Sequence, residues 1–111
     1  MKSVRHLYSI DKYRKERTVI EVNEYFDGKV KSFNISSPDG KKTVGVMQPG
    51  EYKFDTQTKE TITVVAGEFS VYIAQYDEWE DFGAGSSFDI PAQSKFKVKV
   101  AVDTAYLCAY E

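Results

Sequence analysis

The chain has 111 residues, of which 41% are hydrophobic, 29% charged and 14% aromatic, and its formal net charge is −2. This length suits one domain with a modest core, and the aromatic and β-branched content excludes an intrinsically disordered chain. No apolar run is long enough to span a membrane, no apolar segment follows the basic N-terminus as in a secretory signal, and the single cysteine excludes an internal disulfide. We therefore expect a cytoplasmic protein with no membrane partner.

Charge is distributed unevenly, because residues 1–20 carry six Lys or Arg side chains against two acidic ones, a net charge of +4. The remaining residues, 21–111, have a net charge of −6. A basic segment of this kind is typical of a solvated tail, although it can also bind nucleic acid or an acidic membrane surface. The acidic remainder argues against nucleic acid as the main partner. We expect a basic N-terminal extension over residues 1–21 and one folded domain over residues 22–111.

From residue 19 onward the apolar residues recur with a period of two, which predicts β-strands. Turn signals separate the strands, among them Pro49-Gly50 and the Gly67-Glu68 pair expected in a tight hairpin. The expected strands, in chain order, are residues 29–35, 43–47, 51–55, 61–66, 69–74, 95–102 and 105–110. Residues 10–17 are a weak candidate for a helical turn. Many short strands separated by turns are typical of a β-sandwich, a jelly roll or a small barrel.

Two segments anchored by glycine match sequence motifs of the cupin fold. Residues 60–67 (ETITVVAG) fit the E-x6-G end of the first cupin motif, and residues 85–91 (GSSFDIP) fit the G-x5-P start of the second. Further matching runs are NEYFDGKV (23–30), VGVM (44–47), PGEY (49–52) and YLCAY (106–110). Together these segments resemble the pyrimidine/purine nucleoside phosphorylase family of small, single-domain cupins. The resemblance covers about residues 22–111 and implies an all-β fold, a single-domain cupin or jelly-roll β-barrel.

The resemblance also implies that the protein is an enzyme, a pyrimidine/purine nucleoside phosphorylase. The reaction of that family is the phosphorolysis of purine and pyrimidine nucleosides, which releases the free base and α-D-ribose 1-phosphate. Inorganic phosphate is then a co-substrate, no cofactor is required, the partners are small molecules rather than nucleic acid, and a homodimer is expected. The alternative is a non-catalytic cupin with a regulatory role or a role in binding a small ligand. In that case the loss of the metal ligands marks the loss of catalytic activity.

The positions that hold metal ligands in other cupins carry no histidine in this chain. Counted forward from Gly50, the first two positions fall on Thr56 and Thr58. Counted back from Glu60, they fall on Phe54 and Thr56, and the third position is Phe96. The only histidine, His6, lies outside the resemblance. A His-rich transition-metal site, with its oxygenase or isomerase chemistry, is therefore not expected.

Glu60 is the candidate catalytic residue. The cupin pattern directs this position into the barrel, with Ile62, Val64 and Ala66 on the same side of the strand. An inward carboxylate without a metal can bind the ribose hydroxyls or stabilise the positive charge that develops on the sugar. The alternative is an exposed glutamate in a turn at the rim of the barrel.

Polar residues near Glu60 are candidates for binding the sugar or phosphate. Thr56, Gln57 and Thr58 lie where metal ligands would otherwise sit, and their hydroxyl and amide groups can form hydrogen bonds with either ligand. The same three residues also suit a polar loop. Lys29 lies within a family-matching segment and is the preferred cationic candidate, whereas Lys95, Lys97 and Lys99 are expected to point outward.

Aromatic residues are candidates for stacking on the nucleobase. Tyr52 and Phe54 share one face of a predicted strand, and Phe96 and Tyr106 belong to the apolar faces of two others. A stacked base contributes roughly 1–3 kcal/mol, although aromatic residues at this spacing more often belong to the core. Met47 is expected beside them as an adaptable wall of the pocket.

Overall fold

A computed structural model describes residues 19–111 of the chain. The helical turn indicated at residues 10–17, and all but the last three residues of the expected basic extension, lie outside the described residues. The described part consists of ten strands and no helix, which confirms the all-β prediction. It accordingly includes no helix able to cross a membrane.

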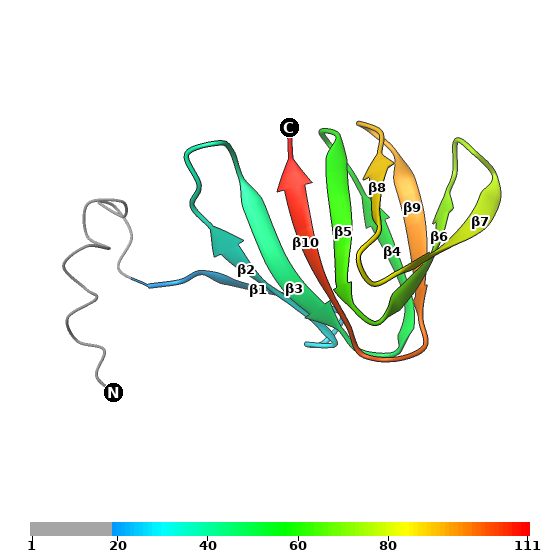
Figure 1. Cartoon of the computed structure of the whole chain (residues 1–111), viewed down its shortest axis with the longest axis horizontal. Helices are drawn as coiled ribbons and strands as arrows, with labels where there is room; N and C mark the ends of the chain where they lie inside the picture. Colours follow the sequence, from blue (N-terminus) through cyan, green and yellow to red (C-terminus); the bar gives the residue numbers. More distant parts are fainter. Residues whose placement is uncertain (1–18) are drawn as a thin grey trace.

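The ten strands form two antiparallel sheets that face each other (Figure 1). In chain order they are β1 (Val22–Tyr25), β2 (Val30–Ile35), β3 (Lys42–Met47), β4 (Gly50–Asp55), β5 (Glu60–Ala66), β6 (Glu68–Ile73), β7 (Glu78–Gly83), β8 (Ser87–Ile90), β9 (Lys95–Val100) and β10 (Thr104–Tyr110). The six-stranded sheet has the order β1-β2-β3-β10-β5-β8, and the four-stranded sheet has the order β4-β9-β6-β7. The expected jelly roll is therefore a sandwich whose two sheets are not closed into a barrel by strand pairing.

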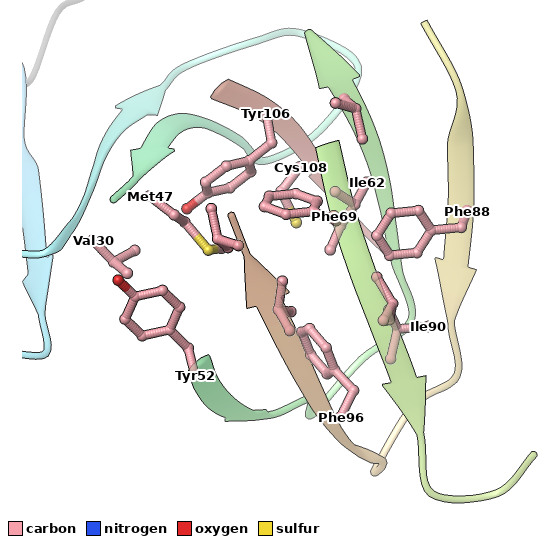
Figure 2. Packing of buried hydrophobic residues seen from close by; sticks show 14 of the residues in the cluster. Val30, Met47, Tyr52, Ile62, Phe69, Phe88, Ile90, Phe96, Tyr106 and Cys108 are labelled. Atoms are coloured by element: carbon pink, nitrogen blue, oxygen red, sulfur yellow. The ribbon is translucent and has the colours of Figure 1, made fainter. Parts of the chain in front are cut away.

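Alternating burial along the strands produces one core between the sheets. In β9 the apolar Phe96, Val98 and Val100 are buried, whereas the alternating lysines are exposed (Lys95 and Lys99) or half-buried (Lys97). Figure 2 shows how the buried side chains of both sheets converge in the space between them. Because the side chains of a strand alternate between its two faces, this pattern confirms the outward orientation predicted for the lysines of β9.

The structure adds three strands that the expected strands did not include, β1, β7 and β8, and corrects the predictions at two further places. The strand expected over residues 95–102 ends at Val100, and Val102 lies in the following turn with 53% of its surface exposed. Ala66, expected to face inward with Val64, is exposed because the pairing of β5 with β10 shifts register between Ala105 and Tyr106. An extra residue in one strand of a pair reverses the facing of the residues beyond it.

Gly45 in β3 allows the six-stranded sheet to hold Tyr106 across its inner face. A Cβ atom at Gly45 would lie 2.7 Å from the Cζ and hydroxyl oxygen of Tyr106 and 2.7 Å from the carbonyl oxygen of Lys31. Only glycine leaves room for the ring, which extends from β10 over β3 towards Ser32 of β2. This contact fixes one wall of the space between the sheets.

Candidate functional site

A cavity of about 740 Å³ lies between the two sheets. Its polar lining gathers where β4 and β10 end and β5 begins, and it consists of Lys41, Asp55, Gln57, Thr58, Glu60 and Glu111. The remaining lining residues, most of them apolar or aromatic, are Tyr25, Ser32, Gly40, Met47, Phe54, Ile62, Phe69, Phe88, Phe96, Val98, Tyr106, Cys108 and Tyr110. Concave sites with mostly apolar walls and a few convergent polar groups are typical of small-molecule binding.

Glu60 is the carboxylate placed furthest into this cavity's polar part. It begins β5, is half-buried, and its Oε1 accepts a hydrogen bond from the Cys108 thiol at 3.4 Å. Burial raises the pKa of Glu60, while the thiol hydrogen bond and the positive charge of Lys41 oppose that rise. The inward position predicted for Glu60 is consistent with these contacts, since Ile62, two residues later on the same face, is buried.

Two further polar side chains of β10 continue from Glu60 across the inner face of the sheet. Burial and the nearby Glu60 carboxylate raise the pKa of Cys108 to about 12, so its thiol stays protonated at neutral pH. The Tyr110 hydroxyl lies within hydrogen-bond distance of the Thr43 Oγ1, at 3.2 Å. Burial raises the pKa of Tyr110 as well. Beside Glu60 the cavity therefore presents neutral hydrogen-bond donors rather than further negative charges.

An aromatic wall runs along the opposite sheet. Phe54 of β4 and Phe96 of β9 are directly paired in register and stack with ring centroids 5.3 Å apart. The ring of Phe26, in the turn between β1 and β2, packs nearly perpendicular to that of Phe54, with the ring centroids 5.6 Å apart. Aromatic rings in this arrangement offer a flat apolar surface to a heterocyclic base.

Most of the residues singled out in the sequence line this cavity. Besides Glu60, the lining includes Phe54, Gln57, Thr58, Phe96, Tyr106 and Met47. The structure thus brings together residues from five strands and one loop, as the inward parity of each strand predicted.

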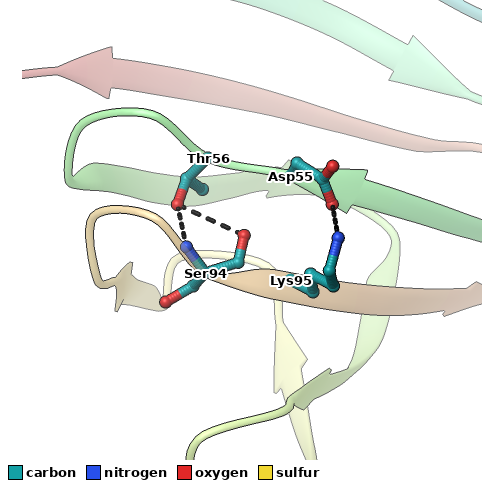
Figure 3. Close-up of polar contacts among 4 residues, drawn as sticks. All are labelled: Asp55, Thr56, Ser94 and Lys95. Carbon is teal, nitrogen blue, oxygen red and sulfur yellow. Dashed lines mark hydrogen bonds and ion pairs between the residues drawn. The ribbon is translucent and has the colours of Figure 1, made fainter.

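Three of the singled-out residues do not line the cavity. Thr56 is only 5% exposed, and its hydroxyl donates to the Pro91 carbonyl at 2.7 Å. The same hydroxyl accepts from the Ser94 N–H at 2.9 Å, a contact drawn in Figure 3. Tyr52 is buried in the core, with its hydroxyl donating to the Gln48 carbonyl at 2.7 Å. Lys29 is exposed in the turn after β1. Two of these side chains stabilise the fold around the site, and Lys29 lies outside it.

Sequence reasoning missed several residues of the site. Alternation along residues 106–110 places Cys108 and Tyr110 on the same face as Tyr106, but only Tyr106 is among the predicted site residues. Lys41 gave no such signal, because it precedes β3 and its approach to the cavity depends on the neighbouring strand. The sequence also carried no signal that Ser32 belongs to the site, since a serine is identified as buried only when its neighbours in the fold are known.

The donor groups do not fit a metal centre of the cupin type. At the positions of the missing histidines, the Thr56 hydroxyl is engaged with the backbone and the Phe54 and Phe96 rings stack on each other. Within residues 19–111 no three His, Cys, Asp or Glu side chains gather closely enough to hold a metal ion. Metal independence of any activity stays a prediction.

Comparison with known proteins identifies relatives of this chain. A family model described as pyrimidine/purine nucleoside phosphorylase matches residues 20–110. A Pseudomonas entomophila (strain L48) protein named pyrimidine/purine nucleoside phosphorylase is 55% identical over 92 residues, which are 83% of this chain and 98% of that protein.

Solved structures agree with this relationship. A Vibrio parahaemolyticus protein of unknown function is 41% identical, with a TM-score of 0.81 over 85% of this chain and all of that chain. An RmlC-like cupin from Shewanella frigidimarina is 20% identical, with a TM-score of 0.66 over 86% of this chain and 84% of that chain. The second likeness concerns the fold alone, and it confirms the predicted cupin architecture.

Proposed function

Because the chain belongs to the pyrimidine/purine nucleoside phosphorylase family, we propose that it is an enzyme that cleaves purine and pyrimidine nucleosides with inorganic phosphate. The products are the free base and α-D-ribose 1-phosphate. The observation that carries the proposal is the 55% identity to a relative of that name over nearly its whole length. We place the reaction in the cytoplasm, as expected from the sequence.

Phosphorolysis sets clear demands on the site. An oxygen of HPO₄²⁻ forms a bond to C1′ of the ribose while the bond from C1′ to the base nitrogen breaks. The electron pair of that bond leaves with the base, and the proton of the phosphate ends on the base. Positive charge develops on the sugar, as in glycoside hydrolysis. The protein must therefore hold phosphate beside C1′, grip the sugar and stabilise this charge.

Glu60 is the residue we propose for the sugar. Its half-buried carboxylate accepts one hydrogen bond from Cys108, and its other lone pairs are free to accept from ribose hydroxyls. A negative charge at this place also stabilises the cationic sugar, because electrostatic interactions strengthen where water is excluded.

The two walls of the cavity suggest where the nucleobase binds and which other polar groups contact the substrate. We propose that the base lies against Phe54 and Phe96, whose stacked rings tolerate purines and pyrimidines alike because every base has a π-face. Met47 and Tyr106 complete the apolar part of the pocket, and Gln57 and Thr58 offer hydrogen bonds at its polar end.

Activity should depend on phosphate and survive removal of metals. We expect purified protein, incubated with uridine, inosine or cytidine in the presence of phosphate and EDTA, to release base and ribose 1-phosphate, and to release neither without phosphate. Chromatography of the products measures both. Nucleoside binding without turnover would favour the non-catalytic alternative, and activity lost on chelation and restored by a metal would contradict the metal-free mechanism.

We also propose that the protein is a homodimer, formed through the outer face of the six-stranded sheet. Large apolar side chains are exposed there on neighbouring strands, and Val22, Phe33 and Val44 lie side by side in register across β1, β2 and β3. Contiguous apolar surface of this kind marks interaction sites in soluble proteins. A two-fold interface would bury the same patch of both copies.

Replacing Val46 by glutamate should weaken that dimer. Val46 is 49% exposed on this face, beside Phe33 and Val44 on the same side of the sheet, and a buried unpaired charge opposes association. Val102→Glu is the matched control, because Val102 is 53% exposed but lies in a turn outside the sheet. Analytical ultracentrifugation should detect dissociation for Val46→Glu alone, whereas a monomeric wild type at micromolar concentration would refute the dimer.

A further inference from the structure

We propose that Lys41, together with the hydroxyl of Tyr110, binds the attacking phosphate. The inference rests on the proposed function and goes further, since it assigns the phosphate site to particular residues. Lys41 precedes β3 at the polar end of the cavity. Among the described residues that line the cavity, no other side chain is cationic.

Backbone pairing places Lys41, which immediately precedes β3, in one row with Tyr110 of β10 and Glu60 of β5. Tyr110 pairs with Glu60 of β5 on one side, and on the other its backbone N–H donates to the Lys41 carbonyl at 3.1 Å. Adjacent strands are about 4.8 Å apart, so the backbones of Lys41 and Glu60 are about 10 Å apart with Tyr110 between them. The Lys41 Nζ lies 4.6 Å from the centre of the Tyr110 ring.

The charge of Lys41 is available for an anion. The other carboxylates at this end are already paired, Asp55 with Lys95 at 3.5 Å and Glu111 with Lys59 at 3.6 Å. Among the described residues no carboxylate lies within 4 Å of the Lys41 ammonium. The positive charge of Lys41 also acts inside the cavity, where it lowers the pKa values of Glu60 and Cys108.

The row separates two roles that phosphorolysis requires. The lysine ammonium and the protonated Tyr110 hydroxyl are hydrogen-bond donors suited to phosphate oxygens. The carboxylate at the other end of the row is suited to ribose hydroxyls and repels phosphate. A nucleoside whose sugar contacts Glu60 would thus expose C1′ to a phosphate held beside Lys41.

Lys41→Gln tests this assignment by removing the charge while keeping much of the side-chain length. We expect the KM for phosphate, measured with saturating nucleoside, to rise about 10-fold, since a charge-assisted contact at an exposed position is lost. The KM for nucleoside at saturating phosphate should change little, and Lys41→Arg should retain much of the phosphate affinity. Tyr110→Phe keeps the ring under the lysine and should raise the KM for phosphate by a smaller factor.

Lys42→Gln is the matched control. Lys42 is the next residue, faces the other side of β3 and is paired with Asp39 at 3.0 Å, so its replacement should leave the KM for phosphate unchanged. Equal effects of the two variants would overturn the proposal, as would an unchanged KM for phosphate in folded Lys41→Gln.

A binding measurement separates this proposal from the proposed function. Inorganic phosphate should raise the Tm of the wild type, compared with chloride at equal ionic strength, and should raise that of Lys41→Gln much less. Phosphate-dependent turnover with an equal Tm rise in both proteins would overturn the Lys41 site and leave the proposed function intact. A Tm rise lost in Lys41→Gln, without turnover by the wild type, would support the site and overturn the proposed function. A wild type that neither binds phosphate nor turns over would overturn both.

Discussion

Replacing Glu60 by glutamine should reduce kcat/KM for nucleoside phosphorolysis by roughly 10- to 100-fold, because a charge-assisted interaction with the substrate contributes about 1.5–3 kcal/mol. Glutamine keeps the shape of the side chain and its ability to accept one hydrogen bond from Cys108, so the variant isolates the negative charge. Steady-state kinetics at saturating phosphate measures the loss. The effect should fall mainly on kcat if the carboxylate stabilises the cationic transition state, and on KM if it binds the ground-state sugar.

The matched control for this variant is Glu51→Gln. Glu51 lies on β4 with its side chain exposed on the outer face of the four-stranded sheet and does not line the cavity. The same chemical change at that position should leave kinetics and Tm nearly unaltered. Wild-type turnover by folded Glu60→Gln would show that the catalytic assignment is wrong, and the work of the site would then belong to its hydroxyls and to Lys41.

The pH dependence gives a second measure of the same residue. Since burial raises the pKa of Glu60, the acid limb of kcat/KM should fall off at a higher pH than an ordinary glutamate would produce, and Glu60→Gln should lack that limb. The contribution of Glu60 to folding stability changes with pH in the opposite direction to its contribution to activity. A carboxyl with a raised pKa in the folded state stabilises the fold below its ordinary pKa, and this contribution is lost as the pH rises through the raised value. Glu60→Gln should therefore unfold at an equal or higher temperature at neutral pH.

Replacing Gly67 by alanine should destabilise the protein by about 3 kcal/mol, from roughly 1–2 kcal/mol of left-handed backbone strain and 1–3 kcal/mol of overpacking. Gly67 has φ +88°, and a Cβ there would lie 2.7 Å from the Asp103 carbonyl oxygen and 2.8 Å from the Thr104 Cα. These atoms cannot move easily, because Thr104 is fully buried and its Oγ1 accepts the Glu68 N–H and donates to the Val102 carbonyl. For a domain of this size the Tm should fall by roughly 12–24 °C.

Two other glycines separate the causes of that loss. Gly85 has φ +92°, but a Cβ there would meet no atom within 4 Å, so Gly85→Ala should show the backbone strain alone. Gly83 has neither feature, and Gly83→Ala should leave the Tm within a few degrees of the wild type. Thermal unfolding of the three variants should give the order Gly67, Gly85, Gly83. A small effect at Gly67, comparable to that at Gly85, would show that the contact with Thr104 relaxes at little cost.

Strands with one buried face could be predicted from the sequence, whereas strands without such a face could not. The alternation of apolar and charged residues in β9 identified its buried side. A strand whose sheet has one face on the core and one in solvent directs every second side chain into the core. In β7 nearly every residue is exposed, so no period of two marks it. The strand β8 was indicated only by the cupin motif that ends at Pro91, because its four residues are too few for a period of two to be recognised.

The sequence by itself determined the inward faces and hence the candidates on them. Parity and family resemblance together selected Glu60, Phe54 and Phe96, all of which line the cavity. Parity failed at Ala66, where a register shift reverses the facing of the chain. It also could not separate Tyr52, which closes the core, from Phe54, which is two residues away on the same face but reaches the cavity.

Only the tertiary structure decided which polar groups meet. The row of Lys41, Tyr110 and Glu60 joins residues from β10, β5 and the segment before β3, which are far apart in the chain, and its register depends on backbone hydrogen bonds between them. The approach of Cys108 to Glu60 and the use of Thr56 as a backbone partner depend on the same pairings. Periodicity along a chain specifies the face on which a side chain lies, but the neighbours across a sheet are set by long-range pairing, which no local pattern encodes.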